Sequence, residues 1–138
     1  MKDLFNAITL KRVISPVSVA DTTAQVGTAV DRKGFESVTY AIATGSIADA
    51  DATFTVLLQE SDDNSTYTDV ADADLLGTEA LAGFQFDDDN ECRKLGYIGA
   101  KRYTKLTITP VANASAALIS AVCILGHAAV KPTVNPPA

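Results

Sequence analysis

The chain has 138 residues, of which 47% are hydrophobic and 20% charged, and this balance predicts a single globular domain rather than a disordered segment. Its formal net charge of −6 argues against direct binding to nucleic acid or to membrane surfaces, because both need a basic surface to meet phosphate groups. The apolar runs fall short of the ~18 residues of a membrane span, and the first residues lack the apolar core of a signal peptide, so we expect a soluble protein synthesised in the cytoplasm.

Period-two alternation of apolar and polar residues predicts β-strands along most of the chain. The clearest case is the segment 37–44, where Val38, Tyr40 and Ile42 would share one buried face. In chain order, the expected strands cover residues 8–14, 25–30, 37–44, 53–60, 67–70, 84–86, 93–98, 102–109 and 117–125. Eight or nine short strands separated by turn-rich joints predict an all-β fold, a single-domain antiparallel β-sandwich of the jelly-roll type.

Helical patterns are confined to residues 69–83, which can hold one or two short turns. Gly77 and Gly83 would end each of them early, because glycine disfavours the helix interior. The stretch SDDNS at 61–65 predicts the turn of a β-hairpin, since short polar side chains bond the local backbone.

Three segments are expected along the chain: an N-terminal arm at 1–9, a β-sandwich at 10–127 and an extended C-terminal tail at 128–138. The tail contains three prolines, which favour extended backbone over a packed core. In the arm, Leu4, Phe5 and Ile8 have two interpretations. They dock on a partner, or they complete the core of the domain itself.

Charge is divided unevenly along the sequence. From Glu36 to Glu91 there are 14 acidic residues and no Lys or Arg, whereas the rest of the chain has 3 acidic and 11 basic residues. Such polarity can steer a partner or order head-to-tail contacts between subunits. The simpler interpretation is a set of acidic, solvated turns.

Metal binding is the first chemistry to test, because carboxylates cluster in several turns. The best calcium candidate is the group Asp87, Asp89 and Glu91, but the glycine and the closing glutamate of an EF-hand loop are missing. Solvated turns are therefore the favoured interpretation, and we expect neither a metal nor any other cofactor.

The sequence offers little for catalysis. The single histidine, His127, lies at the end of an apolar strand, and no Gly-x-Ser-x-Gly motif is present. The chain has no tryptophan to line a sugar cleft and no phosphate-binding loop. Cys92 and Cys123 are too few for a disulfide framework and read as small strand residues. We therefore expect a protein that is not an enzyme.

Two long runs carry a resemblance to a known family. The run from LFNAITLKRV to FTVLLQESDD, residues 4–63, resembles small virion-associated proteins of tailed bacteriophages and prophages. The run from ADADLLGTEA to RYTKLTITP, residues 71–110, is similar to the same family in the same order. The resemblance implies a capsid decoration (cement) protein on the outer surface of the virion, with the major capsid protein as partner and a homotrimer as self-associated state.

The expected capsid contacts combine the arm with the basic residues of the two flanks. They are Leu4, Phe5, Ile8, Lys11, Arg12, Arg93, Lys94, Lys101 and Arg102. Two alternatives stay open. The first is a structural component of the phage tail, neck or tail tip, and the second is a carbohydrate- or Ca²⁺-binding β-sandwich module.

Overall fold

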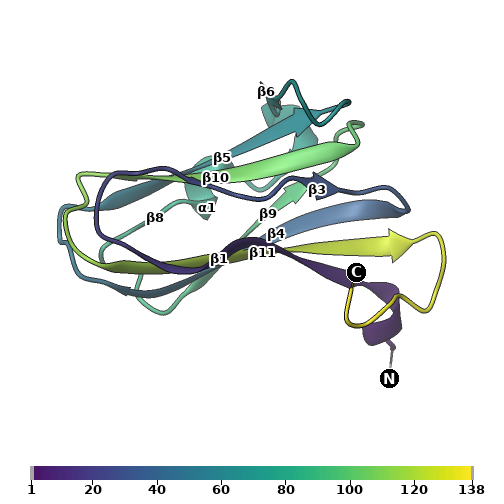
Figure 1. The fold of residues 1–138 in the computed structure, drawn as a ribbon, viewed down its shortest axis with the longest axis horizontal. Coiled ribbons are helices and arrows are strands. Elements are labelled where there is room, and N and C mark those ends of the chain that lie inside the picture. The colour runs from purple at the N-terminus through teal and green to yellow at the C-terminus, as the bar shows by residue number, and fades with distance from the viewer. Residues whose placement is uncertain (1, 138) are drawn as a thin grey trace.

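The computed structural model describes residues 2–137 as a sandwich of two antiparallel β-sheets (Figure 1). The first sheet contains, in spatial order, β1 (Thr9–Val19), β11 (Ala117–Ala128), β4 (Phe35–Ile47), β9 (Cys92–Tyr97) and β7 (Leu75–Leu76). The second contains β2 (Gln25–Val26), β10 (Tyr103–Val111), β5 (Thr53–Ser61) and β6 (Thr68–Asp69), with β3 (Val30–Asp31) paired to β10 and β8 (Phe84–Gln85) paired to β5. The β-sandwich expected from the sequence is confirmed.

Helical structure within residues 2–137 is limited to three short segments, of which two lie in the predicted range 69–83 and one, in the N-terminal arm, was not predicted. They are η1 (Phe5–Ala7), η2 (Asp72–Asp74) and α1 (Glu79–Ala82). Thr78 caps α1 by accepting a hydrogen bond from the Leu81 amide at 3.1 Å, and Gly83 ends it. None of the helices among residues 2–137 is long and apolar enough to cross a membrane.

The segments with the clearest alternation form the centre of the sandwich. Tyr40 and Ile42 of β4 and Leu58 of β5 are fully buried between the two sheets. The rings of Phe54 and Phe84 stack with their centroids 4.7 Å apart and close the core beside α1. Each of these residues follows the period-two pattern that places one strand face in the core.

Several strands run further than the sequence pattern predicts, and β4 and β1 gain the most residues. β4 continues to Ile47 through a segment expected to be a turn, because its pairing with β11 extends to Ile47 opposite Ala117. β1 continues to Val19 although it contains Pro16. It is an edge strand, and its register shifts between Ile14 and Val17, so the missing amide of the proline breaks no ladder.

Residues 2–137 contain eleven strands rather than eight or nine, because five of the strands are only two residues long and pair with a longer neighbour. Such pairs depend on contacts between distant parts of the chain. The hairpin at 61–65 is confirmed: β5 and β6 are antiparallel, with Gln59 opposite Asp69.

The arm and the tail lie together at one end of the sandwich (Figure 1). The Thr133 amide donates to the Asn6 carbonyl at 3.0 Å, and the Thr133 hydroxyl donates to the Ile8 carbonyl at 2.5 Å. The Ala129 amide donates to the Gly34 carbonyl at 2.9 Å. Residues 129–133 therefore fold back along η1 and the start of β1.

Candidate interaction surface

A cluster of exposed apolar side chains covers the end of the sandwich where the arm and the tail meet. We call it the terminal surface and define it by Leu4, Phe5, Leu10, Val130 and Val134. Their exposed fractions run from 50% for Leu10 to 78% for Val130. Phe5, Leu10 and Val134 also line one shallow hollow of about 130 Å³. Exposed apolar side chains gathered at one end of a domain are typical of sites where another protein binds.

The exposure of Leu4 and Phe5 contradicts one of the two interpretations of the arm, that these residues complete the core of the domain. Leu4 is 66% exposed and Phe5 is 67% exposed, so neither completes the core. Ile8 is half-buried and lies under the tail, where its carbonyl accepts from Thr133. The arm is therefore held in place by the tail while its large side chains face outward.

A groove of about 670 Å³ lies next to the terminal surface, between the start of β1, the segment 28–35 and the tail. We call it the tail groove. Val30 is buried and Phe35 half-buried at its base, while Val130 and Val134 belong to its exposed wall. The charged residues that line it are Lys11, Arg12, Lys33 and Asp31.

Asp31 forms an ion pair with Arg102, which lies far from it in the sequence. The guanidinium group donates to both carboxylate oxygens, at 2.9 and 2.7 Å, and this bond lowers the pKa of Asp31 below its ordinary value. The charge that the groove offers to an incoming group is therefore mainly positive.

The residues expected to form a basic contact surface are not brought together. Lys11 and Arg12 line the tail groove. Lys101 forms an ion pair with Asp62, and Lys94 lies on the outer face of the first sheet, opposite Ala41 of β4. Arg102 pairs with Asp31, and its guanidinium carbon lies 5.0 Å from the centroid of the Tyr103 ring.

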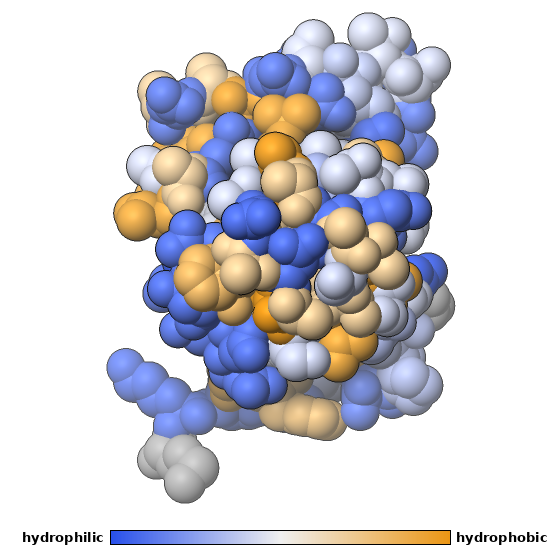
Figure 2. Space-filling model, turned by 90° about the vertical axis from the view of Figure 1, so that its left-hand side faces the viewer, coloured by the Kyte–Doolittle hydropathy of each residue, from blue (hydrophilic) through white to orange (hydrophobic). Residues whose placement is uncertain are grey.

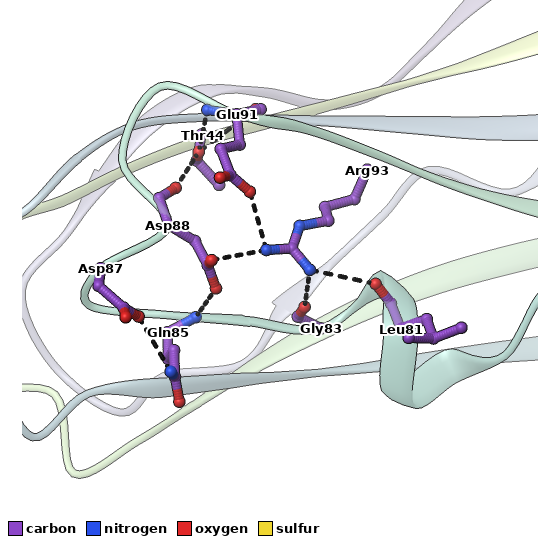
Figure 3. A network of polar contacts seen from close by, with 8 residues as sticks. All are labelled: Thr44, Leu81, Gly83, Gln85, Asp87, Asp88, Glu91 and Arg93. Carbon is purple, nitrogen blue, oxygen red and sulfur yellow. Dashed lines mark hydrogen bonds and ion pairs between the residues drawn. The ribbon is translucent and has the colours of Figure 1, made fainter.

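Arg93 is the centre of a polar network near the opposite end of the sandwich (Figure 3). One terminal nitrogen lies 2.7 Å from a carboxylate oxygen of Asp88 and 2.8 Å from one of Glu91. The other donates to the carbonyl oxygens of Gly83 and Leu81, at 3.3 and 3.4 Å. This guanidinium therefore joins the segment after β8 to the end of α1. Its contacts stabilise the fold of the chain itself.

The carboxylates of the candidate calcium group Asp87, Asp89 and Glu91 do not point to one common position. Asp89 accepts from the Ile47 amide at 2.9 Å, Asp87 accepts from the Gln85 side chain at 2.9 Å, and Glu91 pairs with Arg93. Each carboxylate thus faces a different partner. Within residues 2–137, no group of three or more His, Cys, Asp or Glu side chains gathers so that it can hold a metal ion.

Acidic residues gather at the end of the sandwich opposite the terminal surface, where β1, β4, β8 and β10 end. The acidic side chains in the connections there are Asp21, Asp49, Asp51, Asp87, Asp88, Asp89 and Glu91. Figure 2 faces this end and shows hydrophobic side chains interspersed among hydrophilic ones. We call this end the acidic end, although acidic residues also occur at the other end, where Asp31 of β3 and Ser61 of β5 both pair with Tyr103 and Asp62 and Asp63 follow Ser61.

Sequence reasoning did not identify Leu10, Lys33, Val130 and Val134 as members of the site. Val130 and Val134 are separated by Pro132 in a segment read only as a stiff tail. Valines outside any predicted strand are a sequence signal for an apolar contact. The fold is needed to show that these two line hollows together with Phe5 and Lys33.

No protein-family model and no curated protein matches the sequence. Among solved structures, the chain is similar to the PBSX exported protein XepA, with a TM-score of 0.59 and 15% identity. The match covers 100% of this chain and 43% of XepA, so the chain spans less than half of that protein.

Carbohydrate-binding modules match less closely. The C-terminal family 22 module of Clostridium thermocellum Xyn10B gives a TM-score of 0.45 at 10% identity, over 94% of this chain and all of that one. A xylan-binding domain of the same module family gives 0.42 at 11% identity, over 90% of this chain and 88% of that one. At these identities the likeness to XepA establishes the β-sandwich fold alone.

Proposed function

We propose that this chain is a structural component of a tailed-bacteriophage particle, and specifically a decoration protein that binds the outer surface of the assembled capsid. The terminal surface carries the proposal, because five exposed apolar side chains lie at the one end of the sandwich that holds both the arm and the tail. The resemblance of residues 4–63 and 71–110 to virion-associated proteins supports it. The shared fold with XepA, a prophage-related protein, is consistent with a phage origin.

The terminal surface has the properties that such a role requires. A decoration protein that binds only the assembled shell stabilises that shell by mass action. The symmetry of a capsid repeats one modest contact many times, so each copy needs only moderate affinity. Leu4 and Phe5 present apolar area for this contact, and the tail fixes the backbone around them through Thr133. We expect the copies to associate as homotrimers on the shell.

The location in the particle can be tested by cryo-electron microscopy of virions of the phage that encodes the chain. Density of this sandwich on the outer capsid, with its terminal surface toward the shell, is the expected result. Density confined to the tail, neck or tail tip would instead assign the chain to that part of the virion. Absence of the chain from purified particles would overturn the proposal altogether.

The contact surface can be tested by co-sedimentation of purified protein with isolated capsids. Phe5→Ser should weaken binding by at least about tenfold, because burial of a large apolar side chain contributes about 1.5–3 kcal/mol. Leu81→Ser is the matched control, since Leu81 is 71% exposed on α1 and Phe5 67% exposed on η1. Equal binding by both variants would exclude the terminal surface as the contact.

A further inference from the structure

We infer that the tail groove receives an extended, acidic segment of the protein to which the chain binds. The inference rests on the proposed function, because it names the chemistry of the partner in that contact. It follows from the charges, the shape and the position of the groove.

The first observation is that the groove carries more positive than negative charge. In the part of the chain that the structure describes, neither Arg12 nor Lys33 forms an ion pair. Arg12 donates to the hydroxyl of Ser15 at 2.9 Å, which is a neutral acceptor. The acidic member of the lining, Asp31, is held by Arg102. Carboxylates from a partner are the groups that complement these two cations.

The second observation is the mixed chemistry of the groove walls. Phe35 and Val30 form an apolar base, and Val130 and Val134 an apolar rim that is 78% and 70% exposed. A chain segment that alternates acidic and aliphatic side chains would place carboxylates near Arg12 and Lys33 and bury its aliphatic groups against these residues. The volume of about 670 Å³ accommodates only a few side chains, so a narrow extended segment fits better than a folded surface.

The third observation is the continuity of the groove with the terminal surface. Val130 and Val134 belong to both, and Thr9 lines both the groove and the neighbouring hollow that contains Phe5. A partner seated on Phe5 and Leu10 therefore has a direct path into the groove. The carboxylates between β4 and β5 and between β8 and β9 lie at the opposite end of the sandwich from this path.

The test compares two single charge reversals in the full chain, measured by co-sedimentation with purified capsids. Lys33→Glu places a carboxylate on the groove, and Lys94→Glu makes the same change on the outer face of the first sheet. We expect Lys33→Glu to weaken binding about tenfold and Lys94→Glu to change it less than about twofold. Raising NaCl from about 0.05 to about 0.5 M should weaken the unmodified protein more than Lys33→Glu. Thermal unfolding of both variants checks that the fold is kept.

The outcomes separate the inference from the function on which it rests. Capsid binding that is unchanged by Lys33→Glu and by salt would overturn the acidic partner and leave the capsid role standing. A protein that does not bind capsids at all would overturn both. The groove could instead be occupied by a second copy of this chain, and sedimentation of the protein without capsids tests for such self-association. Self-association that Lys33→Glu abolishes would show that the groove receives the acidic end of a second copy, and would also overturn the inference.

Discussion

The hydroxyl groups of Tyr40 and Thr104 lie 2.6 Å apart in a hydrogen bond that crosses the interior between the two sheets. Tyr40 belongs to β4 of the first sheet and Thr104 to β10 of the second, and both residues are fully buried. Burial raises the pKa of Tyr40 far above its ordinary value, so the phenol is neutral at any pH at which the protein is studied. Each hydroxyl is satisfied by the other, which favours the one alignment of the sheets that joins them.

This pair predicts a coupled loss of stability. Tyr40→Phe and Thr104→Val should each lower the free energy of unfolding by about 1–3 kcal/mol, because each change leaves one buried hydroxyl without its partner. The double variant should lose less than the sum of the two single losses, since no unpaired hydroxyl remains. Urea unfolding of the four proteins measures the coupling. Strictly additive losses would show that the hydrogen bond contributes nothing to the alignment.

The Asp63 carboxylate in the β5–β6 hairpin predicts a dependence of stability on pH. It accepts from the amides of Thr66 and Ser65 and from the hydroxyl of Ser61, each at 2.9 Å, and these bonds lower its pKa to about 2. A group whose pKa is lowered by folding stabilises the fold above its unfolded pKa, here 3.8, and loses that contribution as the pH falls toward 2.

The melting temperature of Asp63→Asn should therefore lie below that of the unmodified protein at neutral pH. The difference should shrink between about pH 4 and pH 2, where the carboxyl of Asp63 becomes neutral like the amide. Differential scanning calorimetry across this range measures it. A difference that stays constant down to pH 2 would contradict the assigned hydrogen bonds.

Removal of the Arg93 guanidinium should destabilise the chain more than removal of that of Arg102. Arg93→Gln leaves Asp88 and Glu91 without their cation and two carbonyl groups without their donor, at a site where the Asp88 side chain is 20% exposed. We expect a loss of about 1–3 kcal/mol in the free energy of unfolding. The control Arg102→Gln breaks an ion pair whose side chains are 45% and 41% exposed, so solvent screens it and the loss should be smaller. Equal losses in urea unfolding would argue against the network in Figure 3.

The two cysteines should differ in reactivity. Cys92 is exposed at the start of β9, whereas Cys123 is buried in β11, and burial raises the pKa of its thiol to about 12. Because the thiolate is the reactive form, iodoacetamide should modify only Cys92 in the folded protein and both residues in urea. Mass spectrometry of the intact chain gives the count, and Cys92→Ser should abolish labelling in the native state. Rapid modification of Cys123 without denaturant would mean that the first sheet opens locally.

The sequence predicts the centre of this fold well, because strand alternation is a local signal. Val38, Tyr40 and Ile42 are buried as their spacing requires. The two-residue strands are different: Leu75–Leu76 is a strand only because β9 lies beside it. No local pattern contains that information.

The candidate site was predicted in part, for the same reason. The arm residues Leu4 and Phe5 stand out in the sequence and are exposed in the structure. The basic residues were grouped by their charge, but Lys101 and Arg102 are bound by Asp62 and Asp31, which lie 39 and 71 positions away. The ion pairs that neutralise Lys101 and Arg102 can be seen only in the folded structure. The same is true of the position of Lys33 beside the tail.

The hydrogen bonds that join Asn6 and Ile8 to Thr133 have a practical consequence for rebuilding the molecule. A short linker between the arm and the tail would close the chain into a ring without spanning the sandwich. New ends opened within residues 20–24, which are all exposed and lie at the acidic end, would give a circular permutant. A passenger domain fused there would point away from the terminal surface, so the molecule is suited to displaying cargo on whatever particle that surface binds.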